Sequence, residues 1–583
     1  MNQSNVLYID LERKGFYVKN RTELFNEWLG GVGVALQLYK EEAVKGADPL
    51  DSGNAIVFAV GPLTALYPLA SKVVAVFKSP LTGNYGESHA GGRSATAIKS
   101  AGYEAIVIKG VSDRPIYLVI SEKGVQFRDA ATLWGMGSTF TVGRVLREAV
   151  PGTGLRTIMR IGRAGEKLVR YACVVTETYR HFGRMGLGAV FGSKKLKALI
   201  VHGKSGIRLP KIKFYRDAYD EIYELAVKSD YMKKYHELGT PMNVLPLNAL
   251  GALPTRNLSE AKFEGAEHIS GEDLAAKKLG RRVACSHCPV ACIHLATIRE
   301  PYPDEPYFYK TTFVSYDYEP LYSMGSMLGI FDVDGLLKLI DEVERRGLDA
   351  MSTGVALAWA TEAYKKGFVK SNDVLVDIDW GNVDAYRVAV DFIVNQPNDF
   401  YKALAMGVDY ASKIYGGREF ALSFGGNEMP GYHTGPATHI GHLIGSRHSH
   451  LDGAGYSIDQ KMKDLSPEEL VNKLIEEECW RQVLSSLVVC YFARRIYEPS
   501  MVKKALNVLG YELDEDRLKE LGRRIYEEKQ ALKASQGFKP DELRIPERIF
   551  EVPTFHGLLD KNYIKAALEY YSQIFNKIVE KTF

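Results

Sequence analysis

The chain has 583 residues, of which 46% are hydrophobic and 25% are charged, values that exclude global disorder and suit roughly three or four globular domains. Lys and Arg number 74 against 71 for Asp and Glu, a net charge of +3, so charge gives no case for nucleic acid or an anionic membrane as the main partner. No apolar run reaches about 18 residues, and residues 1–13 lack the basic start and apolar stretch of a signal peptide. A cytoplasmic protein is expected.

Residues 1–208 are expected to form a strand-rich domain. Short runs of β-branched and aromatic residues, closed by glycine or proline, predict strands at 54–61, 105–110 and 116–120.

Glycine-rich turns in the same region are accompanied by basic side chains. They lie at 30–33, 91–93, 162–165 and 183–188. Glycine lets backbone amides approach an anion closely, and Arg adds a bidentate grip on phosphate. None of the turns matches a nucleotide P-loop. Any single one reads as a plain tight turn, but several in one domain favour a redox cofactor that carries phosphate.

Residues 209–417 are expected to form a mainly helical domain. Helical periodicity appears at 215–234 and 333–346, and a Ser/Thr pair begins a further helix at 352–366.

Three of the six cysteines lie close together in this domain. Cys285, Cys288 and Cys292 form a C-x2-C-x3-C run. Such spacing directs several thiolates to one inorganic centre, and an iron–sulfur cluster takes four of them. A zinc site, to which His287 could contribute, is the alternative. Six cysteines are too few for a disulfide framework in a chain of this length.

Residues 418–583 are expected to form a third domain, mainly helical, that begins with a loop rich in glycine and histidine. Ser466 and Pro467 mark a helix start, with serine as the cap and proline in the first position. Cys490 and Cys479 in this domain are candidates for the fourth thiolate. Cys173 in the first domain is a weaker candidate.

Several ordered segments together resemble the tungsten-dependent aldehyde:ferredoxin oxidoreductase family along essentially the whole chain. They are 77–83, 90–92, 101–106, 183–190 with 192–194, the cysteine run, 347–349 and Cys490. The resemblance implies an α+β fold: a strand-rich base domain that binds cofactor (1–208), then two mainly helical domains (209–417 and 418–583).

The resemblance also implies cofactors and partners. A tungsten atom would be held by two pterin cofactors, with one [4Fe-4S] cluster nearby and a magnesium ion between the pterin phosphates as a further expectation. Electrons would pass to ferredoxin or a ferredoxin-like subunit, and the substrate would be an aldehyde. Molybdenum in place of tungsten, the preferred aldehyde and the oligomeric state are left open.

Site residues follow from the matching motif positions. The cluster ligands of the family fall on Cys285, Cys288, Cys292 and Cys490, which leaves Cys479 and Cys173 as ordinary buried residues. The cofactor contacts fall on Lys72, His89, Gly91, Arg184, Gly186, Leu348, Asp349 and Arg447.

This chain departs from the family pattern at two of these positions and at a third, Ser485. Lys72 replaces an arginine that bridges cluster and pterin. His89 replaces a metal-linking asparagine and still offers its backbone carbonyl. The family's second D-x-x-G-L motif has Ser485 in place of its acid.

Aldehyde oxidation needs a base and an orienting donor beside the metal. Glu319 aligns with the active-site acid of the family, and we expect burial to raise its pKa toward that of a useful base. The hypothesis is that Glu319 deprotonates the attacking water while His450 and Tyr318 orient the carbonyl. His448 is the alternative to His450, because the spacing from Arg447 differs from the family by about a residue.

Two rival functions remain. One is a tungsten-dependent reductase of aromatic or carboxylate substrates in the same architecture. The other is a non-catalytic metal-binding or electron-transfer subunit.

Overall fold

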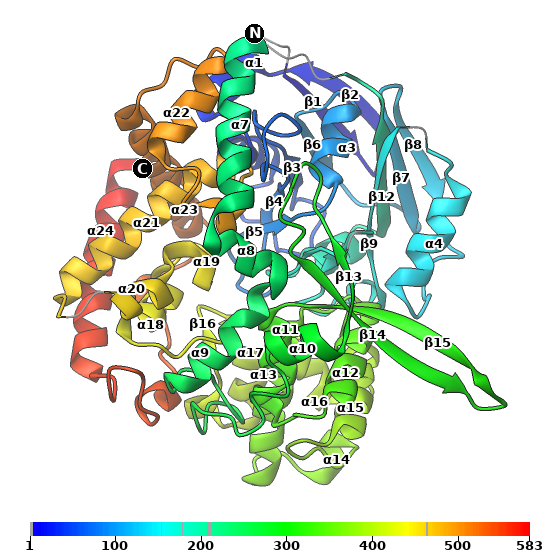
Figure 1. Ribbon diagram of the computed structural model, residues 1–583, viewed down its shortest axis with the longest axis vertical. Coiled ribbons are helices and arrows are strands. Elements are labelled where there is room, and N and C mark those ends of the chain that lie inside the picture. The colour runs from blue at the N-terminus through cyan, green and yellow to red at the C-terminus, as the bar shows by residue number, and fades with distance from the viewer. Residues whose placement is uncertain (1–3, 153, 178, 207–211, 462–463, 583) are drawn as a thin grey trace.

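The computed structural model describes residues 4–152, 154–177, 179–206, 212–461 and 464–582. Two six-stranded sheets make up the N-terminal part, and the remainder is mainly helical (Figure 1). The α+β fold expected from the sequence is confirmed.

The first sheet has the strand order β2-β1-β6-β3-β4-β5. Strands β1 and β6 are parallel, and the other pairs are antiparallel. Its strands are β1 (Asn5–Asp10), β2 (Gly15–Asn20), β3 (Ile56–Ala59), β4 (Val73–Lys78), β5 (Tyr85–Ala90) and β6 (Ala105–Lys109).

The second sheet has the order β11-β10-β9-β12-β7-β8, with β7 and β12 parallel. Its strands are β7 (Ile116–Ser121), β8 (Gly124–Asp129), β9 (Leu155–Ile161), β10 (Val174–Val175), β11 (His181–Phe182) and β12 (Leu196–Gly203).

Both faces of the first sheet are buried except along its edge strand β2, which is mostly exposed. In β1, Val6 and Tyr8 pack into a core with helices, whereas Leu7 and Ile9 pack into a core shared with the second sheet. Successive side chains of a strand point to opposite faces, so a strand covered on both sides reads as a continuous apolar run.

Six helices belong to the N-terminal part: α1 (Thr22–Trp28), α2 (Gly31–Glu42), α3 (Ser94–Ser100), α4 (Thr139–Ala149), α5 (Arg163–Glu166) and α6 (Leu187–Ser193). The glycine turn at 30–33 serves packing. Gly31 has φ +41°, and a Cβ there would lie 2.2 Å from the carbonyl oxygen of Ser485. The absence of a side chain therefore lets α2 approach the third part of the chain closely.

The second part is helical but also contains a three-stranded sheet that the sequence reasoning did not predict. Its strands are β13 (Leu279–Val283), β14 (Ile293–Tyr302) and β15 (Glu305–Tyr316), and the β14–β15 hairpin projects from the body of the molecule (Figure 1). The cysteine run connects β13 to β14.

The second part contains helices at the three predicted segments, with two differences, and further helices that were not predicted individually. They are α7 (Ile212–Lys228), α8 (Asp230–Glu237), α9 (Val244–Ala249), α10 (Gly271–Lys277), α11 (Tyr318–Met324), α12 (Val333–Arg346), α13 (Ala350–Lys365), α14 (Ser371–Val374), α15 (Val383–Asn395), α16 (Asp399–Leu404) and α17 (Val408–Tyr415). The predicted helix at 215–234 is interrupted at Ser229, which has extended backbone. Helix α13 begins earlier than predicted, because Asp349 caps it by accepting the Met351 amide.

The third part contains a two-stranded hairpin, β16 (Ser423–Phe424) and β17 (Asn427–Glu428), and then helices. They are α18 (Pro436–Ile444), α19 (His450–Gly453), α20 (Gly455–Lys461), α21 (Pro467–Ser486), α22 (Pro499–Val508), α23 (Glu515–Ser535) and α24 (Lys561–Thr582). Ser466 caps α21 as predicted. Cys490 does not lie on this helix; it follows α21, immediately before the short turn Tyr491–Ala493.

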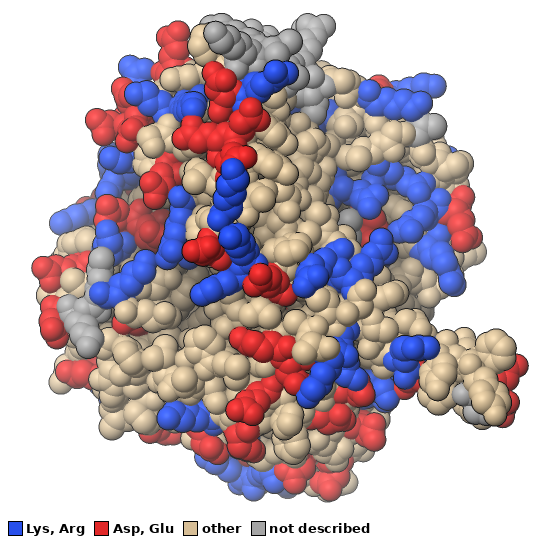
Figure 2. Space-filling model, viewed as in Figure 1, with Lys and Arg blue, Asp and Glu red and all other residues tan. Residues whose placement is uncertain are grey.

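The domain boundaries stay predictions. The boundary at 208/209 falls outside the described residues. Side chains from both sides of residue 417 share one hydrophobic core. On the face shown in Figure 2, acidic and basic side chains are interspersed. Among the described residues, no helix is both long and apolar enough to cross a bilayer.

Candidate active site

A cavity of about 350 Å³ lies where the three parts of the chain meet. The first part of the chain contributes Lys72, Glu87, His89, Gly91, Arg180, Gly183 and Arg184 to its lining. The second part contributes Cys285, Cys288, Cys292, Asp317, Glu319, Glu344, Leu348 and Asp349. The third part contributes Asn427, Arg447, His450, Cys490 and Phe492. The cavity therefore brings together residues that the sequence holds far apart.

The four cysteines expected to bind a cluster all line this cavity. Their thiols are close enough to interact electrostatically, and burial, together with Cys285, raises the pKa of Cys288 to about 12. The amide of Gly92 donates to the sulfur of Cys285 at 3.1 Å. The amide of Cys490 donates to the Leu69 carbonyl at 2.9 Å, which fixes the fourth cysteine to the loop before β4.

The same loop holds His287 outside the cavity. His287 is exposed, does not line the cavity, and contacts Ser286 through Nδ1 at 3.1 Å. Within the part of the chain that the structure describes, no three His, Cys, Asp or Glu side chains are grouped so that they could hold one metal ion. A zinc ion needs its ligands at a single point, whereas an iron–sulfur cluster spreads them over several irons. The other two cysteines are buried, as expected.

Two cations flank the thiols. Burial alone would lower the pKa of Lys72, but electrostatic interaction with Cys490, Cys285 and Cys292 outweighs burial and raises it. No carboxylate in the described ranges forms an ion pair with Lys72. Arg180, which the sequence reasoning missed, faces Cys292 and Cys285 and pairs with Asp317 at its other side. Lys72 is half-buried. A cation withdrawn from water without a carboxylate needs a nearby anion, and an iron–sulfur cluster with four thiolates would supply one.

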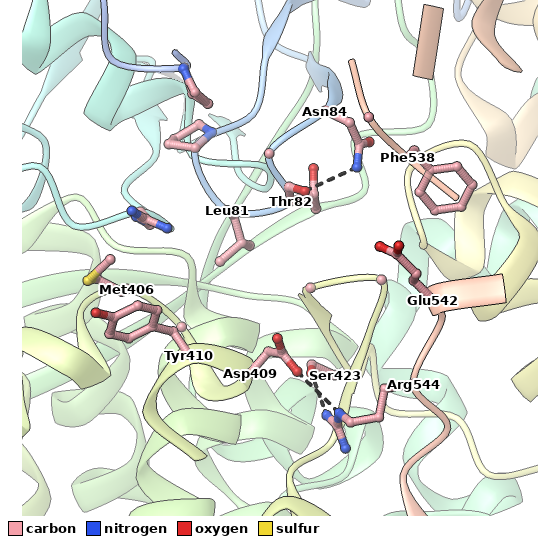
Figure 3. Close-up of a pocket in the computed structure, with 18 of the residues that line it drawn as sticks. Leu81, Thr82, Asn84, Met406, Asp409, Tyr410, Ser423, Phe538, Glu542 and Arg544 are labelled. Atoms are coloured by element: carbon pink, nitrogen blue, oxygen red, sulfur yellow. Dashed lines mark hydrogen bonds and ion pairs between the residues drawn. The ribbon is translucent and has the colours of Figure 1, made fainter. Parts of the chain in front are cut away.

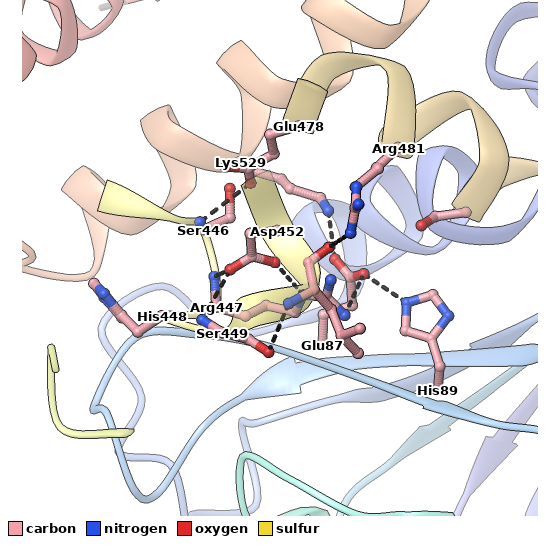
Figure 4. A network of polar contacts seen from close by, with 12 residues as sticks. Glu87, His89, Ser446, Arg447, His448, Ser449, Asp452, Glu478, Arg481 and Lys529 are labelled. Atoms are coloured by element: carbon pink, nitrogen blue, oxygen red, sulfur yellow. Dashed lines mark hydrogen bonds and ion pairs between the residues drawn. The ribbon is translucent and has the colours of Figure 1, made fainter. Parts of the chain in front are cut away.

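Arg447 is held in the cavity by a buried ionic network (Figure 4). Its Nε donates to Asp452 at 2.7 Å, and its Nη1 lies 3.4 Å from Glu87. Glu87 also contacts His89 at 2.6 Å and forms an ion pair with Lys529. Burial alone would raise the pKa of Glu87, but Lys529 and Arg447 hold it well below its ordinary value.

Sequence reasoning missed Glu87, although a signal existed. Glu87 and His89 stand two residues apart on β5, so they share one face of the strand. No comparable sequence pattern pointed to Lys529 on α23 or to Asp452 on α19.

Arg184 also lines the cavity. Its Nε donates to Asp349 at 3.2 Å, and its Nη2 donates to the Glu428 carbonyl at 2.7 Å. Its Nη1 is buried and has no hydrogen-bond partner among the described residues. An unpaired guanidinium N–H is costly inside a protein unless a ligand accepts from it. The site thus fits an anionic group such as the phosphate of a pterin cofactor.

Glu319 and His450 face each other in the cavity. His450 Nε2 lies 3.3 Å from Glu319 Oε1, and the Tyr432 hydroxyl donates to the same oxygen at 3.4 Å. Burial alone would raise the pKa of Glu319. The hydrogen bond and the charge of His450 outweigh burial, so the pKa is lowered below its ordinary value. The expectation of a raised pKa is therefore wrong: the carboxyl is held below its ordinary value by a partner from the third part of the chain.

Three expected site residues are not directed into the cavity. His448 places Nδ1 3.1 Å from the His442 carbonyl and Nε2 3.1 Å from Lys533 Nζ. The Tyr318 hydroxyl donates to the Gly431 carbonyl, so it is not free to donate to a substrate oxygen. Gly186 packs against Arg170, where a Cβ would lie 2.0 Å from the carbonyl oxygen.

The remaining cofactor positions, Lys72, His89, Gly91, Leu348, Asp349 and Arg447, line the cavity together with Arg184. Ser485, the residue in place of the second family acid, instead contacts the Tyr491 hydroxyl at 2.5 Å.

Comparison with known families decides the relationship. The model of the aldehyde ferredoxin oxidoreductase N-terminal domain matches residues 6–203, and the model of domains 2 and 3 of the same family matches residues 217–575. The chain belongs to the aldehyde ferredoxin oxidoreductase family. The resemblance read from the sequence is confirmed, and the chain is an oxidoreductase of this family.

Relatives within and around the aldehyde ferredoxin oxidoreductases extend over most of the chain. A tungsten-containing aldehyde ferredoxin oxidoreductase of Thermococcus kodakarensis is 32% identical over 558 residues, covering 92% of this chain and 89% of the relative. The aliphatic sulfonate oxidoreductase WOR-like subunit of Pyrococcus furiosus is 30% identical over 418 residues, covering 67% of this chain and 64% of that subunit.

A solved structure has the same fold. The active-site complex BamBC of benzoyl coenzyme A reductase aligns with a TM-score of 0.81 at 19% identity, covering 98% of this chain and 94% of that one. At this identity the likeness concerns the fold alone. The names of these proteins give different substrates. The substrate of this family member must therefore be inferred from its own site residues.

Proposed function

We propose that this protein oxidises aldehydes to carboxylic acids at a bis-pterin tungsten centre and passes the electrons through one [4Fe-4S] cluster to ferredoxin. The observation that carries the proposal is the Glu319–His450 pair, because a carboxylate and an imidazole then lie in the same cavity as four thiols and the guanidinium groups of Arg184 and Arg447.

The cavity residues divide by the group that each would hold. Arg184 and Arg447 suit pterin phosphates, because a guanidinium binds phosphate in a bidentate manner. Asp349 and the backbone at Leu348, Gly91 and His89 suit the pterin rings and a magnesium ion. Cys285, Cys288, Cys292 and Cys490 suit the cluster, with Lys72 beside it. When bound, the metal supplies a two-electron sink and a Lewis acid.

The chain itself supplies the proton chemistry. Because His450 lowers the pKa of Glu319, this carboxyl is ionised at neutral pH and can take a proton from the water that attacks the aldehyde carbon. His450 Nδ1 is buried without a partner among the described residues, so the doubly protonated ring can donate from it to the substrate oxygen while Nε2 contacts Glu319. The Tyr318 hydroxyl has no role in this proposal. Pro320, Leu451 and Phe492 line the cavity and provide an apolar surface for the substrate chain.

The test is elemental analysis of protein purified anaerobically, followed by assays with aliphatic and aromatic aldehydes and a viologen dye. We expect one tungsten and about four irons per chain, and dye reduction that depends on aldehyde. Molybdenum in place of tungsten would change the metal named in the proposal and leave the proposed reaction unaffected. Activity confined to the reduction of aromatic or carboxylate substrates would overturn the reaction, and one zinc without tungsten or molybdenum would overturn the whole proposal.

A further inference from the structure

The β14–β15 hairpin extends from the body of the molecule as an arm, residues 297–313 (Figure 1). One face of the hairpin packs on the body at its base, where Ala296 and Val314 are fully buried and Glu300 pairs with Lys338 of α12 at 2.8 Å. Farther out, residues 301–305 and 307–310 are all exposed. A two-stranded hairpin is at best marginally stable in water by itself, so a surface that covers the arm would stabilise it.

An aromatic stripe lies on the other face of the arm, which we call the outer face. Tyr307, Tyr309 and Phe313 are separated by even numbers of residues, so they share this face of β15. Their exposed fractions are 91%, 49% and 37%. The guanidinium of Arg299 on β14 lies 4.8 Å from the centre of the Tyr309 ring. Exposed aromatic side chains beside an arginine are typical of the core of a protein–protein interface.

The two ends of the arm carry opposite charges without partners. Arg299 near the base is exposed, and so are Asp304 and Glu305 at the tip; none of the three forms an ion pair with another residue that the structure describes. Figure 2 shows acidic side chains at the end of the arm and basic side chains near its base. Asp304 is five residues beyond Arg299, about 17 Å along an extended strand, which is too far for the two to pair within one arm.

A second cavity, of about 520 Å³, differs from the arm in this respect (Figure 3). Asp409 there pairs with Arg544 at 3.1 Å, and Lys539 pairs with Glu542 at 2.7 Å. These charges are compensated within the chain, so they do not indicate an outside partner. The charges of the arm do.

We propose that the outer face of the arm is a docking surface for a second copy of this chain, with the two arms stacked antiparallel about a two-fold axis near Tyr309. In the register of the hairpin, Tyr309 lies opposite Pro301, which is two residues from Arg299 and three from Asp304. An axis at this level brings Asp304 and Glu305 of each arm to Arg299 of the other arm. It also brings the two Tyr309 rings together at the centre.

The placement of charges favours a second copy over an unrelated protein. A two-fold contact uses the same patch on both subunits, so the patch must be complementary to itself. Opposite charges at similar distances on either side of a central aromatic residue meet this condition, and complementary charge also fixes the register of an interface. A patch for an unrelated partner needs no such symmetry.

The first test measures the mass of the purified full chain over a range of concentrations by size-exclusion chromatography with light scattering. We expect a dimer. Tyr309→Ser should weaken the dimer at least about tenfold, as the loss of a central interface residue does. Phe308→Ser is the matched control: Phe308 is 64% exposed but points to the opposite face, so its loss should leave the dimer unchanged.

The second test exchanges the charges. Arg299→Glu should give a monomer, because it opposes like charges at both ends of the contact. The double variant Asp304→Arg with Glu305→Arg should also give a monomer. The triple variant that combines all three substitutions should restore the dimer, since each basic tip then meets an acidic base. These side chains are exposed, so circular dichroism and metal content should match the wild type in every variant.

Three outcomes would overturn the proposal. A wild-type chain that stays monomeric at every concentration has no such contact. A dimer that R299E and Y309S leave intact forms through another surface. A triple variant that stays monomeric while both charge variants dissociate would show that the tip of one arm does not meet Arg299 of the other. Because these measurements need no turnover, they do not depend on the proposed function.

Discussion

Glu319 and His450 lie 3.3 Å apart although they belong to the first turns of two helices on opposite sides of residue 417. The contact joins a carboxylate and an imidazole at the edge of an apolar surface. It also sets the charge state of Glu319, because the imidazole outweighs the effect of burial on the pKa.

Replacing Glu319 by Gln should abolish the base while keeping the shape of the side chain. We expect activity to fall by about 10²–10⁴-fold, the usual contribution of general acid–base catalysis. Metal content and the cluster spectrum should match those of the wild type. Near wild-type turnover of an E319Q protein that retains its metals would remove Glu319 from the mechanism.

His450→Gln should move the pH dependence of the reaction. A base is active above its pKa, so the acid limb of wild-type activity should lie below the ordinary glutamate value of about 4.3. Without His450, burial remains and raises the pKa of Glu319, so the limb should move to higher pH. His448→Gln is the control, because His448 contacts Lys533 and not Glu319. An acid limb that moves equally in both variants would contradict the assignment.

Cys490→Ser should lower the iron content and the cluster signal, because the fourth thiolate is lost. Cys479 lies on α21 in the hydrophobic core, so Cys479→Ser should leave both unchanged. Iron analysis and low-temperature electron paramagnetic resonance of reduced samples measure the difference. Loss of iron in C479S alone would reverse the ligand assignment.

Glu87→Gln should destabilise the protein, because it leaves Arg447 and Lys529 buried without their shared carboxylate. Breaking a buried ion pair in this way costs about 3–5 kcal/mol. Glu27 pairs with Arg524 at the surface, and Glu27→Gln should change the free energy of unfolding by less than about 1 kcal/mol. Denaturant unfolding of both variants provides the comparison, and equal stability would contradict a structural role for the network.

Much of the fold follows from local sequence. The runs at 105–110 and 116–120 became strands because they are covered on both faces, and Ser466–Pro467 began a helix because serine accepts the free amides of the first turn. The β13–β15 sheet was missed, since its strands pair across the cysteine loop and the projecting hairpin is exposed: Tyr307 is 91% exposed. An exposed hairpin has no buried face, so its sequence need not alternate clearly between apolar and polar residues.

The sequence by itself determined the family, because its motifs have residue types and an order that are visible in one dimension. It also singled out four cysteines, Arg184, Asp349, Arg447 and Glu319, all of which line the cavity, and their roles as cluster and cofactor ligands stay predictions. Only the tertiary structure decided that His450 rather than His448 meets Glu319, that the Tyr318 hydroxyl is taken by a backbone carbonyl, and that the pKa of Glu319 is lowered. Each of these depends on a partner brought from another part of the chain, and no local pattern records which groups a fold will bring within hydrogen-bond distance.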